Sequence, residues 1–402
     1  MSFFTGIKTR LLPLSSRSFH SFADPLMEKI NSIDACANEA VKLIHSTRYD
    51  IECLKKDVEE SEGRLRKLES AHAAQNMLYL KEIYRLQAKL QTAEDAKRQF
   101  FRSIPNATGD LRLVQLATAK LLSALWEICK ENGIVYFPWA GTLVGALSRN
   151  GSIPWDDDAD VCMLEEDLQT LTAALQNSPD YQITVVYDGY VFCKQIRFSS
   201  KDPFNPCFVD IAPLYWARTC THELDDTMKA MQSEFVMALS GRINGDLNYW
   251  SRYPVLYAPQ SGNVSQNVEA HRDEQDIQHV NYVVNEFEST LSKFKSRATE
   301  LGILCDREEA GALASGFEVY RDDAPHRPLL FDKDLFSPVT TTLYEGEEIP
   351  LCHNAYAFCD QVYPGWPYLA DNLLEVSHFS KTELQKPKIR EHLENLVADM
   401  KC

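Results

Sequence analysis

Aspartates occupy alternate positions in the segment 151–163, which reads GSIPWDDDADVCM: Asp156, Asp158 and Asp160. If the residues from Asp158 onward form a strand, Asp158 and Asp160 point to the same face, and Ala159 points into a core with Val161. Two neighbouring carboxylates repel each other, so a fold keeps them together when a cation lies between them. Because such oxygen ligands hold Mg²⁺ against the phosphates of a substrate, the segment predicts a metal site for phosphate chemistry.

A solvated acidic loop and a calcium-binding EF-hand loop are the other interpretations of this run. An EF-hand loop has Gly at its sixth position and usually Glu at its twelfth. The present sequence has Val161 and Asp167 at those positions, and the Pro-Trp pair before the run does not continue an incoming helix. Calcium is therefore disfavoured. The residues upstream of the run disfavour the solvated loop.

An apolar stretch upstream ends at Gly141-Thr142, and a short segment compatible with a helix follows. Thr142 is a suitable N-cap for that helix. Gly141 lets the backbone approach a ligand closely, and a helix N-terminus offers free amides to an anion. A Gly-Thr turn that leads into a helix, followed by a strand with an Asp-x-Asp pair, predicts a phosphate-binding turn beside the metal site.

Downstream of these motifs, Asp188-Gly189 separates two β-rich runs, 181–187 and 190–198. This arrangement is a strong signal for a hairpin. A further strand, 207–214, carries Asp210 among apolar neighbours, where a carboxylate is costly unless it is paired or bound to metal. The sheet is therefore expected to bring Asp210 to the other two carboxylates. Helices are predicted for the segments 222–240 and 266–300, with a loop between them.

The segment from Leu26 to Phe101 has no proline and a single glycine, and hydrophobic residues repeat in it every seven positions. The repeat comprises Ile30, Ala37, Ile44, Ile51, Val58 and Leu65. Such heptads predict a coiled coil over residues 24–105, with one stutter, and self-association through it. A long helix that folds back on its own domain is the alternative. Pro105 marks the boundary of a catalytic domain over residues 106–402.

Residues 1–23 contain three basic residues and no acidic residue, which is typical of a basic flexible tail. A mitochondrial transit peptide has a similar composition. No stretch approaches the roughly 18 uncharged apolar residues of a membrane span, so no transmembrane segment is expected. We expect a cytoplasmic protein, with peripheral membrane association or mitochondrial import as alternatives.

The composition is that of a globular enzyme. The chain has 402 residues, of which 45% are hydrophobic and 25% charged, enough for one or two domains with a sizeable core. Its formal net charge of −17 argues against nonspecific binding of nucleic acid, because there is no basic field to release counterions. A small basic pocket for phosphates is compatible with that charge.

The 11 cysteines are scattered and form no Cys-x-x-Cys pair. Several lie in apolar surroundings, such as Cys129 and Cys162, so reduced core thiols are expected rather than a disulfide framework. The spacing of Cys352, His353 and Cys359 is poor for zinc.

Two blocks of sequence, which contain the Gly-Thr pair and the aspartate run, together resemble the signature of the LicD family of phosphotransferases, which includes fukutin-related proteins. They are Gly141-Thr142-Leu143-Val144-Gly145-Ala146-Leu147 and Ile153-Pro154-Trp155-Asp156-Asp157-Asp158-Ala159-Asp160. Two later blocks resemble the family's third-carboxylate segment and its closing motif: Phe208-Val209-Asp210-Ile211-Ala212-Pro213-Leu214, and Leu343-Tyr344-Glu345-Gly346 with Tyr363-Pro364-Gly365-Trp366. The resemblance spans residues 107–370 and is weakest over 215–330.

The resemblance implies an α+β fold of the nucleotidyltransferase (polymerase beta) type, a mixed sheet with flanking helices behind the N-terminal coiled-coil helix. It implies transfer of a phospho-alcohol such as phosphocholine from a CDP-activated donor to a hydroxyl of a glycan or glycoconjugate, with release of CMP. Mg²⁺ or Mn²⁺ is the implied cofactor. The implied catalytic and metal-binding residues are Asp158, Asp160 and Asp210, the last as ligand or as base. The implied substrate-binding residues are Gly141, Thr142, Arg149 and Asp156.

Three alternatives stay open at this point. A nucleotidyltransferase that moves NMP to a small molecule shares the metal geometry and would release pyrophosphate instead of CMP. A non-catalytic scaffold would act through its coiled coil, although the three intact carboxylates disfavour it. For Lys194, Gln195 and Arg197, a solvated strand face and a phosphate contact are both compatible with strand alternation.

Overall fold

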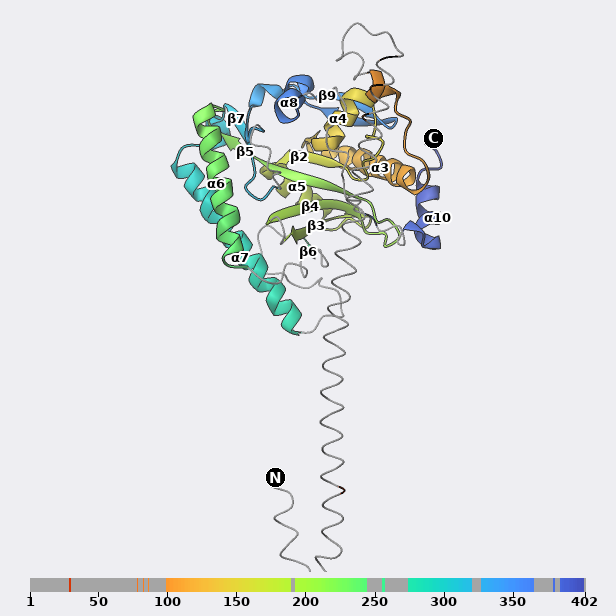
Figure 1. Cartoon of the computed structure of the whole chain (residues 1–402). Helices are drawn as coiled ribbons and strands as arrows, with labels where there is room; N and C mark the ends of the chain where they lie inside the picture. The colour runs from red at the N-terminus through yellow and green to blue at the C-terminus, as the bar shows by residue number, and fades with distance from the viewer. Residues whose placement is uncertain are drawn as a thin grey trace, which may run out of the picture. The chain divides into compact units, whose positions relative to one another are not determined.

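The structure of the chain is a computed structural model (Figure 1). The residues that it describes are 29, 78, 82, 86, 99–188, 192–243, 255–256, 274–319, 327–364, 379 and 384–400. The chain divides into two compact units, Met1–Ala74 and Gln75–Cys402, and every element below belongs to the second. The predicted tail and nearly all of the predicted coiled coil lie outside the described residues, so both stay predictions.

The second unit has helices and strands in mixed order. The helices are α3 (Gly109–Asn132), α4 (Ala140–Arg149), α5 (Glu165–Leu175), α6 (His222–Ser240), α7 (Glu274–Glu300), α8 (Ala355–Val362) and α10 (Pro387–Leu396), with 3-10 turns η2 (Arg307–Glu309) and η3 (Lys333–Leu335). The strands are β1 (Tyr136–Pro138), β2 (Asp160–Leu164), β3 (Tyr181–Asp188), β4 (Cys193–Ser200), β5 (Phe208–Ala217), β6 (Val255–Leu256), β7 (Ala312–Ser315), β8 (Leu330–Asp332), β9 (Thr340–Tyr344) and β10 (Glu347–Leu351). In the described part of the chain, no helix is long and apolar enough to cross a membrane.

The strands form one large mixed sheet and a separate hairpin. The large sheet has the order β1-β2-β5-β4-β3-β6, and β7 pairs with both β5 and β8. Strands β2 and β5 are parallel, whereas the other pairs are antiparallel. The hairpin consists of β9 and β10. The predicted α+β class with a mixed sheet and flanking helices is confirmed.

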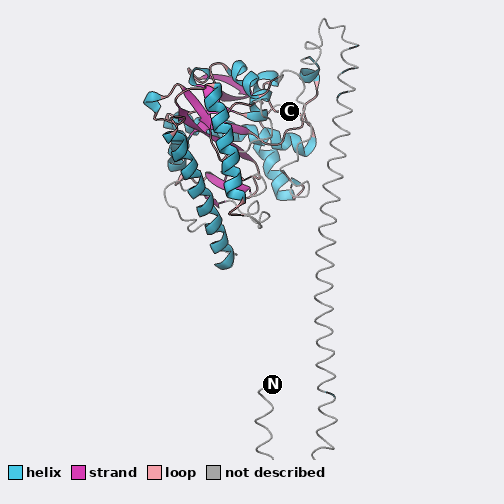
Figure 2. Cartoon of the chain, turned by 60° about the vertical axis from the view of Figure 1, so that its left-hand side comes forward, coloured by secondary structure: helices cyan, strands magenta, loops and turns pink. Residues whose placement is uncertain are grey.

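Successive residues of β2 pack into two different hydrophobic clusters. Val161 and Met163 belong to a larger cluster with residues of α3, α5, α6 and α7. Cys162, which lies between them, belongs to a second cluster with residues of α4 and α8. Because successive side chains of a strand point to opposite faces, the two clusters cover opposite faces of the sheet. Figures 1 and 2 show α6 and α7 lying side by side.

Several predicted elements are confirmed, one with its predicted ends and others with shifted ends. The predicted hairpin is the antiparallel pair β3–β4, and the predicted helix 222–240 is α6, whose N-cap Thr221 accepts the N–H of Leu224. Of the predicted helix 266–300, residues 274–300 form α7, and the preceding residues lie outside the described part. Ala159 is buried as expected, but β2 begins at Asp160 rather than two residues earlier.

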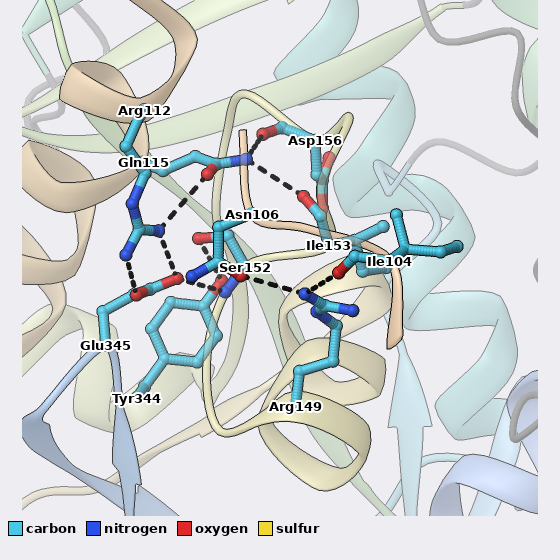
Figure 3. Close-up of polar contacts among 10 residues, drawn as sticks. All are labelled: Ile104, Asn106, Arg112, Gln115, Arg149, Ser152, Ile153, Asp156, Tyr344 and Glu345. Atoms are coloured by element: carbon cyan, nitrogen blue, oxygen red, sulfur yellow. Dashed lines mark hydrogen bonds and ion pairs between the residues drawn. The ribbon is translucent and has the colours of Figure 1, made fainter. Parts of the chain in front are cut away.

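A buried polar network holds the loop that connects α4 to β2 (Figure 3). Arg112 of α3 donates from Nη1 and Nη2 to the two carboxylate oxygens of Glu345, at 2.8 and 2.7 Å. Oε1 of Glu345 also accepts the N–H of Ser152 at 2.8 Å. The side chains of Arg112 and Glu345 are 12% and 8% exposed. This bidentate pair therefore ties α3 and the β9–β10 turn to the loop.

Three further contacts fix the same loop. Gln115 donates from Nε2 to the carbonyl oxygens of Ile153 and Asp156, at 3.0 and 2.8 Å. The Tyr344 hydroxyl donates to Ser152 Oγ at 3.2 Å, and burial raises the pKa of Tyr344, which keeps it a neutral donor. A Cβ at Gly151 would lie 2.5 Å from Oε1 of Glu345, so a larger residue there would displace the Glu345 carboxylate from this position.

Arg149, the last residue of α4, anchors the segment that enters the domain. Its guanidinium donates to the carbonyl oxygens of Phe101 and Ile104, at 2.6 and 2.7 Å, and to Oδ1 of Asn106 at 2.9 Å. Phe100 and Phe101 are buried in the second cluster. The packing of the second unit therefore includes residues that precede the predicted boundary at Pro105.

The network predicts a stability difference between two arginine variants. Arg112→Met should lower the free energy of unfolding by about 3–5 kcal/mol, because it leaves the buried Glu345 carboxylate without its cation. Arg390→Met is the matched control, since Arg390 makes an ion pair with Asp110 in which the side chains are 47% and 32% exposed. Its cost should stay below about 1 kcal/mol. Urea unfolding of both variants measures the difference, and equal losses would contradict the role of the network.

Candidate metal and phosphate site

Asp158, Asp160 and Asp210 each place one carboxylate oxygen within 4.8 Å of the other two. Among the described residues, this is the only group of three or more His, Cys, Asp or Glu side chains close enough to hold a metal ion. All three residues are partly buried. The structure therefore brings together the three acidic residues that the sequence singled out.

The register of two strands places two of the three carboxylates. Asp160, at the start of β2, lies beside Asp210 of β5 in a parallel pair. The N–H of Asp210 donates to the carbonyl oxygen of Ala159 at 2.8 Å, which fixes the register at this end of the sheet. Asp158 lies two residues before β2, so the loop conformation positions it and strand alternation does not.

Thr142 connects α4 to the metal-site strand. The sequence predicted Thr142 as an N-cap, but α4 begins at Ala140 with Trp139 before it, so Thr142 lies in the first helical turn. Its buried Oγ1 accepts the N–H of Asp160 at 2.8 Å. The N–H of Trp139 donates to the carbonyl oxygen of Asp160 at 2.9 Å. The N-terminus of α4 is thereby held beside the carboxylates.

Gly141 makes a close approach, as predicted, but the group that approaches it belongs to the protein. A Cβ at Gly141 would lie 2.3 Å from Oδ2 of Asp156, whose side chain is buried. A carboxylate is stabilised at a helix N-terminus by the partial positive charge there. Asp156 therefore lies against the start of α4, and any larger residue at position 141 would displace it.

Arg197 of β4 lies next to the carboxylates. Its Nε donates to Oδ1 of Asp210 at 3.0 Å, and its Nη2 donates to Oε1 of Gln195 at 2.8 Å. The guanidinium carbon lies 3.9 Å from the centre of the Phe208 ring. One oxygen of Asp210 therefore has a cationic partner within the protein.

The donor set of this site suits a hard divalent cation. Three carboxylate oxygens are the ligands that Mg²⁺ and Mn²⁺ prefer, and the partial exposure of the site leaves room for water or phosphate oxygens. A structural zinc site would instead use Cys and His ligands. In the described part of the chain, Cys352, His353 and Cys359 form no group of three ligands close enough to hold a metal ion.

Arg149, which was predicted to bind substrate, has partners within the protein. Its three hydrogen bonds all go to oxygens of residues 101–106. Arg149 is therefore an anchor of that segment, and its role in substrate binding stays a prediction.

Sequence reasoning missed the residues that support the site from a distance. No sequence pattern singled out Arg112 or Gln115, and Glu345 was named only as part of a family motif. Glu345 is 233 positions away from Arg112, so no local pattern predicts their contact. The one available signal was a charged residue, Glu345, in a short hairpin turn next to a buried tyrosine.

Comparisons with known proteins agree with this geometry. Residues 133–239 match the family model described as LicD/FKTN/FKRP, nucleotidyltransferase domain. An uncharacterized protein of Rickettsia prowazekii is 30% identical over 160 residues, which cover 36% of this chain and 59% of that protein. The lipopolysaccharide cholinephosphotransferase LicD of Haemophilus influenzae is 41% identical over 59 residues, or 15% of this chain and 22% of that protein.

An uncharacterized protein of Rickettsia typhi is 24% identical over 155 residues, which cover 36% of this chain and 50% of that protein. The chain thus aligns with less than two thirds of the length of each of these relatives. The matched segment nevertheless contains the whole carboxylate triad, the Gly-Thr turn and Arg197. Residues 133–239 are thus similar to the nucleotidyltransferase domain of the LicD/FKTN/FKRP family.

Proposed function

We propose that this protein is a metal-dependent phosphotransferase with a fold of the polymerase beta type. It moves a phospho-alcohol, such as phosphocholine, from a CDP-activated donor to a hydroxyl of a glycan or glycoconjugate and releases CMP. The observation that supports this most is the convergence of Asp158, Asp160 and Asp210 beside the start of α4. Such a site suits a diphosphate that is bound with Mg²⁺ or Mn²⁺.

The relatives support the class of reaction. The aligned protein of Haemophilus influenzae is named a lipopolysaccharide cholinephosphotransferase, which is a transfer of phosphocholine to a glycoconjugate. The carboxylate triad fits a transfer of phosphorus-containing groups, because a cation held there would act on the phosphates whichever alcohol they carry. The predicted self-association and cytoplasmic location remain parts of this proposal that come from the sequence.

In the proposed reaction, the acceptor oxygen forms a bond to the phosphorus that carries the alcohol. The bond from that phosphorus to the bridging oxygen breaks, and the bridging oxygen leaves with the electron pair as part of CMP. The proton of the acceptor hydroxyl passes to a base. A cation held by the three carboxylates would neutralise negative charge on the phosphate oxygens.

The other residues of the site act mainly by holding the triad and the start of α4 in fixed positions. The bond between Thr142 and Asp160 holds the first turn of α4 against the triad, and that turn has backbone N–H groups without helical acceptors. The Arg112–Glu345 pair and Gln115 hold the loop that carries Asp158. Fixed groups of this kind lower the barrier because they need no reorganisation when the phosphoryl group moves.

Analysis of the released product tests the proposed function. The full chain, incubated with a panel of CDP-alcohols, a glycoconjugate acceptor and Mg²⁺ or Mn²⁺, should release CMP and lose this activity when a chelator is added. Release of pyrophosphate from a nucleoside triphosphate and a small acceptor would show NMP transfer instead. If neither CMP nor pyrophosphate is released with any donor, the result would favour the non-catalytic scaffold.

The metal ligands are tested by conservative variants. Asp158→Asn and Asp160→Asn should each lower turnover by at least about 100-fold, because an amide loses the charge that binds the cation. Thermal unfolding should be unchanged or slightly improved, since each variant removes a repulsion between like charges. Asp180→Asn, at an exposed position before β3, is the control with unchanged activity. Full activity in both site variants would exclude the assignment.

Asp210 is expected to act as a metal ligand, and Asp210→Asn distinguishes this from a role as base. For a ligand, the variant should bind Mn²⁺ more weakly in calorimetry, and high Mn²⁺ or Mg²⁺ should restore part of the turnover. For a general base, metal and CDP-alcohol should bind normally while turnover falls about 10²- to 10⁴-fold. The contact with Arg197 favours the ligand role, because a carboxylate that accepts a hydrogen bond from a guanidinium is a weaker acceptor for the proton of a substrate.

A further inference from the structure

Arg197 continues a row of functional side chains across three neighbouring strands. Asp160 of β2 pairs with Asp210 of β5, and Asp210 pairs with Arg197 of β4. Residues that are paired directly across strands point to the same face, and neighbouring strands are about 5 Å apart. The guanidinium therefore lies on the face of the carboxylates, at the end of the row opposite to Thr142 and α4.

The guanidinium is held in one orientation. Nε is bound to Asp210 and Nη2 to Gln195, at 3.0 and 2.8 Å. The ring of Phe208 supports its flat side, and that ring lies 5.7 Å from the ring of Phe379, near the C-terminus. A cation that is stacked on an aromatic ring and hydrogen-bonded on one edge keeps its other edge in a fixed direction.

The other edge of the guanidinium is available. Nη1 and the second proton of Nη2 have no hydrogen-bond partner among the residues that the structure describes, and the Arg197 side chain is 21% exposed. Two parallel N–H groups of an arginine match two oxygens of a phosphate. Arg197 therefore offers a site for a phosphate next to the place where a cation would be held.

The charge of the site points to the same ligand. Three carboxylates carry one more negative charge than one divalent cation neutralises, and a diphosphate adds further negative charge. A nearby fixed cation offsets part of that excess, as arginine does in other phosphoryl-transfer sites. Within the row, Arg197 is the cation that directly adjoins a triad carboxylate.

We propose that Arg197 binds a phosphate of the donor's diphosphate directly, through the edge of its guanidinium that faces away from Asp210. This inference rests on the proposed function, because it takes the carboxylates as the seat of the cation that accompanies the diphosphate. Arg197 then has two tasks: it orients Asp210 through Nε, and it holds the substrate through Nη1 and Nη2.

Calorimetry on the full chain tests the inference, with Mn²⁺ alone and then with inorganic pyrophosphate at saturating Mn²⁺ as probes. Arg197→Met keeps the apolar stem over Phe208 but has no donors. It should bind Mn²⁺ at least as tightly as the parent chain, because a neighbouring positive charge is removed. Its affinity for pyrophosphate should fall about 10- to 100-fold. Arg197→Lys should lose less, since it keeps the charge without the paired donors.

Arg218→Met is the matched control. Arg218 follows β5 and makes an exposed ion pair with Glu309, so both affinities should be unchanged. Should Arg197→Met fail to fold by circular dichroism, Arg197→Lys still decides the point: an affinity for pyrophosphate equal to that of the parent overturns the inference. Weaker Mn²⁺ binding in Arg197→Met, with unchanged pyrophosphate affinity at saturating Mn²⁺, would also overturn it and leave Arg197 as a positioning residue for Asp210.

The same measurements separate this inference from the proposed function. A parent chain that binds Mn²⁺ and pyrophosphate through Arg197, yet releases no CMP from any CDP-alcohol, would support the inference and contradict the proposed reaction. If the parent chain releases CMP but the Arg197→Met variant binds pyrophosphate normally, the proposed reaction is supported and the inference about Arg197 is contradicted. A parent chain that binds neither probe would overturn both.

Discussion

Mutual repulsion among three carboxylates is the constraint that the rest of the domain has to satisfy. Oxygens of Asp158, Asp160 and Asp210 lie within 4.8 Å of one another, which is unfavourable until a cation joins them. The hydrophobic core enforces the arrangement, because Val161 and Ile211 pair in the same register as Asp160 and Asp210 and are buried on the opposite face. A slip of one residue would move the carboxylates to the core side, so burial of the apolar residues fixes the geometry of the charges.

The third carboxylate depends on a more distant part of the chain. Asp158 lies in a loop whose backbone is held by Gln115 and by Glu345 with its partner Arg112. Glu345 lies outside the segment 133–239 that matches the family model. The matched segment therefore does not contain everything that shapes its own site, and the hairpin β9–β10 is part of the functional unit. Loss of either partner of this ion pair would leave an uncompensated charge in the protein and would remove one of the contacts that hold the loop.

The sequence predicted the parts of the site that follow from local patterns. Asp158 and Asp160 could be predicted from their spacing and mutual repulsion, and Asp210 because a carboxylate among apolar residues needs a partner. The helix α6 and the β3–β4 hairpin could be predicted because their periodicity and turn residues are local signals. Thr142 was wrongly predicted as an N-cap, because it lies in the first turn of α4 and its hydroxyl accepts the N–H of Asp160, 18 residues away. The resemblance implied that Arg149 binds substrate, and tertiary packing gives it three oxygen partners within the protein that no local pattern predicts. Contacts of this kind depend on the fold, so single-residue chemistry does not reveal them.

The row of Asp160, Asp210 and Arg197 has α4 at one end and β4 at the other, and the two ends offer different partners to an anion. At the α4 end, Asp156 already lies against Gly141, and Ala140 has a φ of 46°, a left-handed conformation that is costly for a residue with a Cβ. The partial positive charge of the helix therefore acts first on a carboxylate of the protein. At the opposite end, Arg197 carries a full charge with one edge directed away from its protein partners. Under the proposed function, a phosphate at α4 would share the partial charge of the helix with Asp156. A phosphate at Arg197 would share a full charge with Asp210 and would meet an edge of the guanidinium that Asp210 does not use, so we expect the stronger attraction at the β4 end of the site.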